Sequence, residues 1–192
     1  NRVVQGGPGD YGQPTALCRP DSPQNVCTGP EGYANDWTLM LNVIYDIAPD
    51  PKQPRRQIPS VIRQQWNGNS DSVATLFQAW VDAFAEESER SLDKIEAFID
   101  AVLEGEEISA AEVYAGDYAD PKRNWGVIGG SLMAVVTLAA EIRRDGLINP
   151  ITVARVDDKF LIETGERRWL AFHLLYIFFP DSTAWNNIPA RE

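Results

Sequence analysis

Two adjacent arginines, Arg167 and Arg168, follow Gly165 and Glu166 where a strand pattern gives way to a helix pattern. Glycine tolerates the unusual backbone that such a steep turn requires. The first turn of a helix exposes unpaired N–H groups and a partial positive charge, so two arginines there oppose the helix dipole. A bound phosphate would reverse that effect, because backbone N–H groups and planar guanidinium groups both bind it. The run from Thr164 to Arg168 therefore predicts a phosphate-binding turn.

The same run has a purely structural interpretation. Glu166 could form a local salt bridge with one of the arginines at an ordinary surface helix start. Glu166 is also the candidate catalytic residue, because a carboxylate could orient a hydroxyl group or a metal ion. Asp46 is a second candidate base. The sequence alone does not choose between these two carboxylates.

Histidine and cysteine give little support to other chemistry. His173 is the only histidine, and its position between Phe172 and Leu174 favours a core role over a catalytic one. Cys18 and Cys27 lack a second pair or a neighbouring histidine, so no zinc site is expected. No metal ligands are predicted.

The elements around the arginine run follow from hydrophobic periodicity. A β-hairpin is predicted at 151–156 and 159–163, with Asp157 and Asp158 in its turn. Gly165 then begins a helix that Pro180 ends. The other predicted elements are a helix at 132–144 that Gly129-Gly130-Ser131 precedes and Gly146 ends, a strand within 37–47 and a short strand at 188–191.

The middle of the chain predicts acidic amphipathic helices. Apolar residues recur at helical spacing from Val73 to Phe84 and from Leu92 to Leu103, with a break near 88–91 and a further short helix at 109–114. Residues 57–120 carry 3 Lys+Arg and 14 Asp+Glu, so this segment has a net charge of −11. Such acidity repels nucleic acid. It could instead bind a basic protein partner.

Three segments occur in order along the chain: Asp46 to Arg56, with Pro49, Gln53-Pro54-Arg55 and Arg56; Ile142 to Val153, with Gly146-Leu147-Ile148-Asn149-Pro150-Ile151; and Gly165-Glu166-Arg167-Arg168 with Ala171. They resemble the entry strand with its "NP-x-QPR" segment, the "GLxQPI" box and the "GERRxxA" box of the ParB/sulfiredoxin superfamily. Asn149 departs from the usual glutamine. Glu166 stands where sulfiredoxin chemistry needs a reactive cysteine, so that branch is not expected.

In ParB proteins these boxes imply a CTP pocket. The resemblance therefore implies a nucleotide-binding module of a DNA-associated protein in chromosome or plasmid partitioning, with CTP or another nucleoside triphosphate and Mg²⁺ as cofactors. DNA would be contacted through a region outside this chain. The residues assigned to the nucleotide are Thr164, Gly165, Glu166, Arg167, Arg168, Gly146, Asn149, Pro150, Gln53, Arg55 and Arg56.

Two alternatives stay open. One is an enzyme of the same superfamily, namely a slow nucleotide hydrolase, a nuclease or a small-molecule kinase. The other is a protein-interaction module with a vestigial pocket.

The expected fold is α+β, a small mixed sheet with helices and an inserted acidic all-α subdomain. The expected organisation is an irregular arm at 1–35, a ParB-like core at 36–56 and 128–192, and the acidic insertion at 57–127. No uninterrupted apolar run reaches the ~20 residues of a membrane span. A cytoplasmic location without membrane contact is therefore expected.

Overall fold

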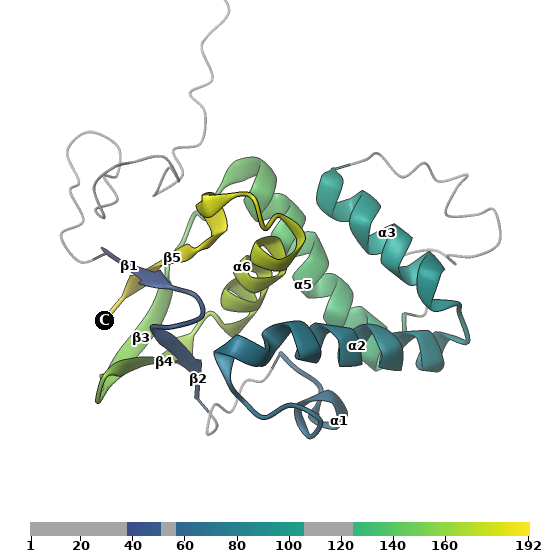
Figure 1. The fold of residues 1–192 in the computed structure, drawn as a ribbon, viewed down its shortest axis with the longest axis horizontal. Helices are drawn as coiled ribbons and strands as arrows, with labels where there is room; N and C mark the ends of the chain where they lie inside the picture. The colour runs from purple at the N-terminus through teal and green to yellow at the C-terminus, as the bar shows by residue number, and fades with distance from the viewer. Residues whose placement is uncertain (1–37, 51–56, 106–124) are drawn as a thin grey trace, which may run out of the picture.

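A mixed β-sheet forms one end of the molecule (Figure 1). The computed structural model describes residues 38–50, 57–105 and 125–192. β3 pairs antiparallel with β4 and parallel with β5, while β4 pairs parallel with β2. This arrangement confirms the predicted small mixed sheet of an α+β fold. The strands, in their order across the sheet, are β1 (Thr38–Asn42), β5 (Asn187–Arg191), β3 (Ile151–Val156), β4 (Lys159–Thr164) and β2 (Ile47–Pro49).

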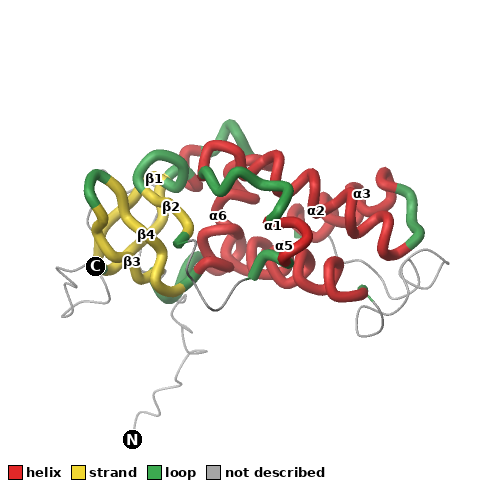
Figure 2. Tube along the Cα trace, turned by 90° about the horizontal axis from the view of Figure 1, so that it is seen from below, coloured by secondary structure: helices red, strands yellow, loops and turns green. Residues whose placement is uncertain are grey.

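The helices gather on the other side of the molecule, and α6 lies nearest to the sheet (Figure 2). The break predicted at 88–91 is confirmed, because Glu89 adopts a left-handed conformation with φ 53° between α2 and α3. The predicted helix at 109–114 and the arm at 1–35 lie outside the described residues. The described helices are α1 (Ser60–Arg63), η1 (Ser70–Ser72), α2 (Val73–Ser88), α3 (Leu92–Glu104), α5 (Gly126–Asp145), α6 (Glu166–Phe178) and η2 (Thr183–Trp185).

The strand predicted within 37–47 is two short strands joined by a turn. Asn42 organises this turn, because its Oδ1 accepts the backbone N–H groups of Ile44 and Tyr45, both at 3.0 Å. Asp46 closes it by accepting the Asn42 N–H at 2.7 Å. Asn and Asp side chains commonly form such turns. The apolar periodicity of residues 37–47 indicates one continuous strand, so the turn-forming Asn42 and Asp46 are not recognised as a turn signal.

Helix α5 starts six residues before its predicted first residue, at Gly126 rather than at 132. Its first turn is capped from a distant part of the chain. The Glu87 carboxylate, at the end of α2, accepts three backbone N–H groups at 3.0–3.1 Å, and this contact satisfies donors that a helix start leaves unpaired. The three donors belong to Val127, Ile128 and Gly129.

Gly129 and Gly130 therefore lie inside α5 and not before it. The Phe84 ring occupies the space that a Cβ at Gly129 would need, at 2.3 Å, so α2 packs this closely only against glycine. Glycine lowers helix propensity, which is why the sequence suggests a break here. Capping and packing by α2 override that local preference.

Helix α5 is central to the hydrophobic core. It packs against α2, α3 and α6, and its buried side chains include Leu132, Val135 and Ile142. Among the described helices, α5 alone has the length and apolar composition of a membrane span. The core helix of a globular protein has the same two properties, so they are weak evidence for a membrane span.

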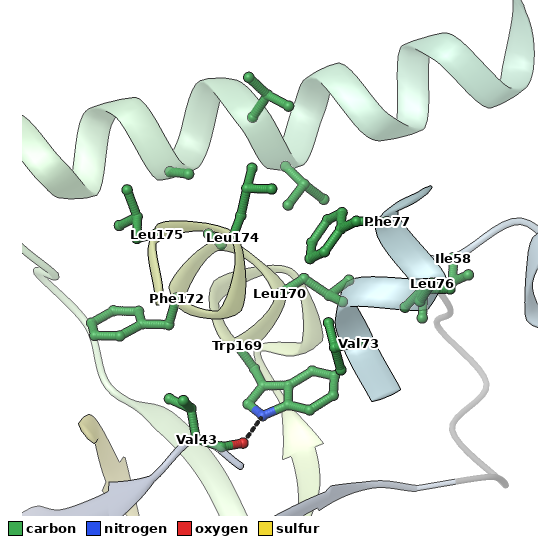
Figure 3. Close-up of a cluster of buried hydrophobic side chains, with 14 of the residues drawn as sticks. Val43, Ile58, Val73, Leu76, Phe77, Trp169, Leu170, Phe172, Leu174 and Leu175 are labelled. Carbon is green, nitrogen blue, oxygen red and sulfur yellow. Dashed lines mark hydrogen bonds between the residues drawn. The ribbon is translucent and has the colours of Figure 1, made fainter. Parts of the chain in front are cut away.

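The buried face of α6 meets α2 and the sheet in one cluster. Figure 3 shows Leu170 and Leu174 of α6 beside Phe77 of α2, and Trp169 directed toward Val43 after β1. Trp169 and Leu170 are both fully buried. This packing fixes the position of α6, and hence of the turn that precedes it.

Candidate functional site

The turn between β4 and α6 requires Gly165. This residue has φ 102°, and a Cβ there would lie 2.8 Å from Cγ2 of Ile151 in β3. The N–H groups of Arg168 and Trp169 already bond to the Gly165 carbonyl, at 2.9 and 3.1 Å, and Gly165 has no side chain with which to cap the helix. The backbone N–H groups of Glu166 and Arg167 precede these bonds and are donors that the helix itself cannot satisfy.

Two side chains that lie one turn apart on α6 anchor this helix to the turn after β1. Trp169 Nε1 and His173 Nε2 both donate to the Val43 carbonyl, at 3.1 and 2.9 Å. Burial lowers the pKa of His173 to about 3, although its bond to Val43 opposes that shift. His173 is therefore neutral and buried at physiological pH, as its apolar sequence context predicts.

Glu166 is buried, and both of its carboxylate oxygens are engaged. Oε2 accepts the Gln57 backbone N–H at 2.7 Å, and Oε1 lies 2.6 Å from Nη2 of Arg63 in α1. The salt bridge is therefore long-range rather than the local pair with Arg167 or Arg168. Such a carboxylate holds the loop before α1 against α6, which favours a positioning role over a catalytic one.

The two arginines have different environments. Arg167 is exposed, and its Nε donates to Gln57 Oε1 at 2.9 Å. Gln57 in turn donates to the Ser131 carbonyl of α5 at 3.3 Å. Arg168 is half-buried, and its Nη1 donates to the Pro150 carbonyl at 3.1 Å. Arg167 is thus the more available cation, whereas Arg168 also holds the loop between α5 and β3.

That loop contains the second predicted set of residues, at 146–150. Gly146 ends α5, as predicted, and its N–H bonds to the Ile142 carbonyl at 2.8 Å. Pro150 is buried under Arg168, and Asn149 is exposed. The structure therefore brings Pro150 to the arginine turn, while the Asn149 side chain has no described contact with it.

Among the remaining predicted residues, Thr164 is the exposed last residue of β4, and it immediately precedes the turn. Asp46 lies at the far end of β4 from Gly165, because the neighbouring Ile47 pairs with Phe160. The two candidate carboxylates, Asp46 and Glu166, are therefore not brought together. Gln53, Arg55 and Arg56 lie outside the described residues.

Gln57 and Arg63 are site residues that periodicity could not identify. They lie in a loop and in a helix of four residues, so no repeating pattern marks them. The one available signal is that Gln57 directly follows the "QPR"-like segment. Within the described ranges, no group of three His, Cys, Asp or Glu side chains is placed to hold a metal ion.

The electrostatic balance of the turn favours an anion. Arg63 matches the charge of Glu166, so the charges of Arg167 and Arg168 remain beside the positive end of the α6 dipole. A helix start with free N–H groups and guanidinium groups suits a phosphate, a sulfate or a carboxylate.

One of the comparisons with known proteins found a similarity. Residues 131–177 match the family model of the ParB N-terminal domain. No curated protein and no solved structure matches the chain. The matched segment runs from the second turn of α5, through the loop at 146–150 and the β3–β4 hairpin, to the end of α6, so it includes the arginine turn. This match over residues 131–177 is consistent with a domain of the ParB/sulfiredoxin type.

Proposed function

We propose that the turn at Gly165–Arg168 binds the phosphate groups of a nucleoside triphosphate, with CTP and Mg²⁺ as the expected ligand. The observation that carries this proposal is the exposed Arg167 at a helix start whose one acidic first-turn residue, Glu166, is neutralised by Arg63. The family match supports a nucleotide in particular, because it covers this turn and the loop that Arg168 holds.

The different roles proposed for Arg167 and Arg168 follow from their contacts. Arg167 can turn toward a phosphate at the cost of one exposed bond to Gln57. Arg168 keeps the Pro150 carbonyl close, and thereby keeps the loop at 146–150 beside the phosphate. Arg167→Ala should therefore remove a ligand contact without unfolding, whereas Arg168→Ala should also loosen the loop.

Nucleotide suits this site better than DNA does. The exposed faces of α2 and α3 carry several carboxylates, among them Asp82, Glu86, Asp93 and Glu96, which repel a polyanion. A triphosphate needs only the local positive potential at the start of α6. A role in a DNA-associated partitioning protein is accordingly proposed through contacts elsewhere.

The test is calorimetric titration of the chain with CTP, ATP, GTP and UTP in the presence of Mg²⁺. Arg167→Ala is the test variant, and Arg155→Ala is its matched control, because Arg155 is an exposed arginine on β3 that pairs with Glu192. We expect CTP to bind best, with an affinity at least about tenfold lower in Arg167→Ala and unchanged in Arg155→Ala.

Each other outcome is decisive. Binding that survives in Arg167→Ala places the phosphates elsewhere. If ATP binds best, the turn at Gly165–Arg168 remains the proposed phosphate site, but the ligand is ATP, the nucleotide of a kinase, and not CTP. The absence of binding to all four nucleotides overturns the proposed function.

A further inference from the structure

A groove of about 650 Å³ runs along α5. Its floor is one face of α5, one wall belongs to α3, and Arg167 of α6 lies on the opposite side. Figure 1 shows α5 running between α3 and α6, as this arrangement requires. The groove is lined by Phe98, Val102, Trp125, Gly126, Gly130, Met133, Ala134, Thr137, Leu138, Glu141 and Arg167.

The groove is elongated. Its floor begins at Gly126 and ends at Glu141, and this stretch of helix spans about 22 Å. Phe98 and Trp125 lie at the first end and Glu141 lies at the other, so one compact small molecule does not contact both ends. A partner helix of about four turns covers the same length. The dimensions therefore suit a peptide segment.

The floor of the groove lets another chain approach α5 closely. Gly126, Gly130 and Ala134 follow one another at every fourth position, which places them on one face of the helix. Gly130 is exposed, and a Cβ at this position would meet no heavy atom within 4 Å. The side chains of a packed helix enter the spaces between such rows of residues. The floor can therefore receive large apolar side chains.

The first end of the groove has an aromatic surface. The rings of Phe98 and Trp125 lie 5.3 Å apart at an angle of 48°, and Trp125 also stacks on Phe84 at 5.6 Å. Phe98, Val102 and Trp125 are only half-buried, so they present apolar surface to the groove. Apolar surfaces of this kind bind the large side chains that anchor an amphipathic helix.

Two opposite charges follow along the groove. Arg167 lies beside the first half of the floor, because Gln57 bonds both to Arg167 and to the Ser131 carbonyl. Glu141 ends the floor, about 15 Å farther along α5 than Ser131. The side chains of Arg167 and Glu141 are both exposed. The groove therefore offers a cation near its middle and a carboxylate at its far end.

The arginines that follow Glu141 have partners of their own. Arg143 Nη1 donates to the Glu104 carbonyl at 3.0 Å, and Arg144 pairs with Asp145 at 2.6 Å. The first of these contacts also brings the end of α3, with the exposed Glu104, to the same end of α5. The far end of the groove is therefore acidic.

We propose that the groove binds an amphipathic helix of a partner protein. This helix presents a large apolar residue to Phe98 and Trp125, an acidic residue to Arg167 and a lysine or arginine to Glu141. Its acidic and basic residues lie about ten or eleven positions apart, because this separation spans about 15 Å of helix. The inference is independent of the proposed function, since it uses the charge of Arg167 and needs no nucleotide.

The experiment begins with random peptides of about 18 residues, enough for a helix of five turns, displayed on phage and selected against the unmodified chain. The enriched peptides are then titrated by fluorescence anisotropy. Gly130→Leu fills the floor of the groove and raises helix propensity. Its matched control is Thr75→Leu, which enlarges an exposed α2 residue that lines a separate hollow of about 290 Å³. Circular dichroism verifies that all the variants fold.

We expect the enriched peptides to share an apolar residue, an acidic residue and a basic residue in this order or its reverse. Gly130→Leu should lower their affinity by about tenfold or more. Thr75→Leu should leave the affinity within about twofold of that of the unmodified chain.

A charge swap tests the acidic end of the groove. Glu141→Lys should weaken binding by about tenfold, and a peptide whose basic residue is replaced by glutamate should recover most of this loss. Glu86→Lys makes the same change on the exposed surface of α2 and should alter the affinity by less than about twofold. Recovery by the swapped peptide separates a direct contact from a change in the fold.

Four outcomes would overturn the proposal. Peptides that bind Gly130→Leu as well as the unmodified chain lie outside the groove. A selection that enriches no peptide over Gly130→Leu leaves the groove without this kind of occupant. A swapped peptide that recovers nothing removes the assigned contact with Glu141. Sedimentation that shows a dimer of the unmodified chain and a monomer of Gly130→Leu replaces the partner helix with a second copy of the chain.

Discussion

The Arg63 guanidinium lies 2.6 Å from the Glu166 carboxylate, although 103 positions separate the two residues. This pair joins the short helix α1 to the first residue of α6. It also cancels the one negative charge in the first turn of α6, so the turn keeps the positive potential of Arg167 and Arg168. The buried Glu166 is therefore compatible with the proposed anion site, because Arg63 neutralises its charge.

The Arg63–Glu166 pair should show strong energetic coupling. Removal of one partner leaves a buried charge unpaired, and we expect Glu166→Ala to lower the free energy of unfolding by about 3 kcal/mol. In a double-mutant cycle with Arg63→Ala, the coupling should exceed about 1 kcal/mol. Urea unfolding of the unmodified chain, the two single variants and the double variant measures this coupling energy.

The Arg144–Asp145 pair is the matched comparison, because its N–O distance is also 2.6 Å but its side chains are 74 % and 40 % exposed. Its coupling should stay below about 1 kcal/mol. Equal coupling in the two cycles would show that burial of Glu166 is energetically unimportant.

Gly165→Ala should strain the turn on two counts. The residue has φ 102°, and the added Cβ would lie 2.8 Å from the Ile151 side chain. We expect a loss of about 1–3 kcal/mol in the free energy of unfolding, together with weaker nucleotide binding. Gly130→Ala is the control, and it should be neutral or stabilising by up to about 1 kcal/mol, because its Cβ enters open space. A Gly165→Ala protein as stable as the unmodified chain would disprove the strain.

Glu87→Ala should destabilise the start of α5. The carboxylate caps three N–H groups at the positive end of a helix, and loss of such a cap costs about 1–2 kcal/mol. The neighbouring Glu86 is exposed and lines a hollow of about 290 Å³ on α2, so Glu86→Ala should change the free energy of unfolding by no more than about 0.5 kcal/mol. Chemical denaturation measures both variants, and similar losses in the two would exclude a specific cap.

His173 should make stability depend on pH. Its pKa falls from an ordinary 6.5 to about 3 on folding, first because burial disfavours the charged ring. The unfolded chain therefore binds a proton that the folded chain does not between these values. The stability that neutral His173 contributes is fully present above pH 6.5 and is lost as the pH falls toward 3. Between pH 8 and pH 5 this loss lowers the free energy of unfolding by about 2 kcal/mol.

His173→Gln removes this titration and can still donate to the Val43 carbonyl. Urea unfolding at pH 8 and at pH 5 should give a smaller pH effect in the variant, since the carboxylates contribute alike to both proteins. If the two proteins lose the same stability on acidification, proton binding by His173 is not responsible.

The sequence predicts well where the signals are local. The β3–β4 hairpin, the Gly165 turn and the end of α5 at Gly146 all follow from residues close to one another in the chain. The same reasoning misplaces the start of α5, because Glu87 and Phe84 stabilise it from α2.

The contacts of the candidate site show the same limit. The sequence marks Arg167 and Arg168, but the partners of Glu166 come from a loop and a four-residue helix that carry no periodic pattern. The groove of about 650 Å³ that α3, α5 and Arg167 line could not be predicted from the sequence either, because α3 and α6 meet α5 only in the folded chain. Local pattern predicts elements here, whereas long-range packing determines the site.

The most direct test of the phosphate turn is an NMR titration of the ¹⁵N-labelled chain with CTP and Mg²⁺. The backbone amides of Glu166 and Arg167 report on the proposed contacts, and those of Asp157 and Asp158 in the hairpin turn serve as internal controls. We predict saturable shifts of the first pair with little change in the second. Saturable shifts confined to other parts of the chain, or no shifts at all, would contradict a phosphate site at the start of α6.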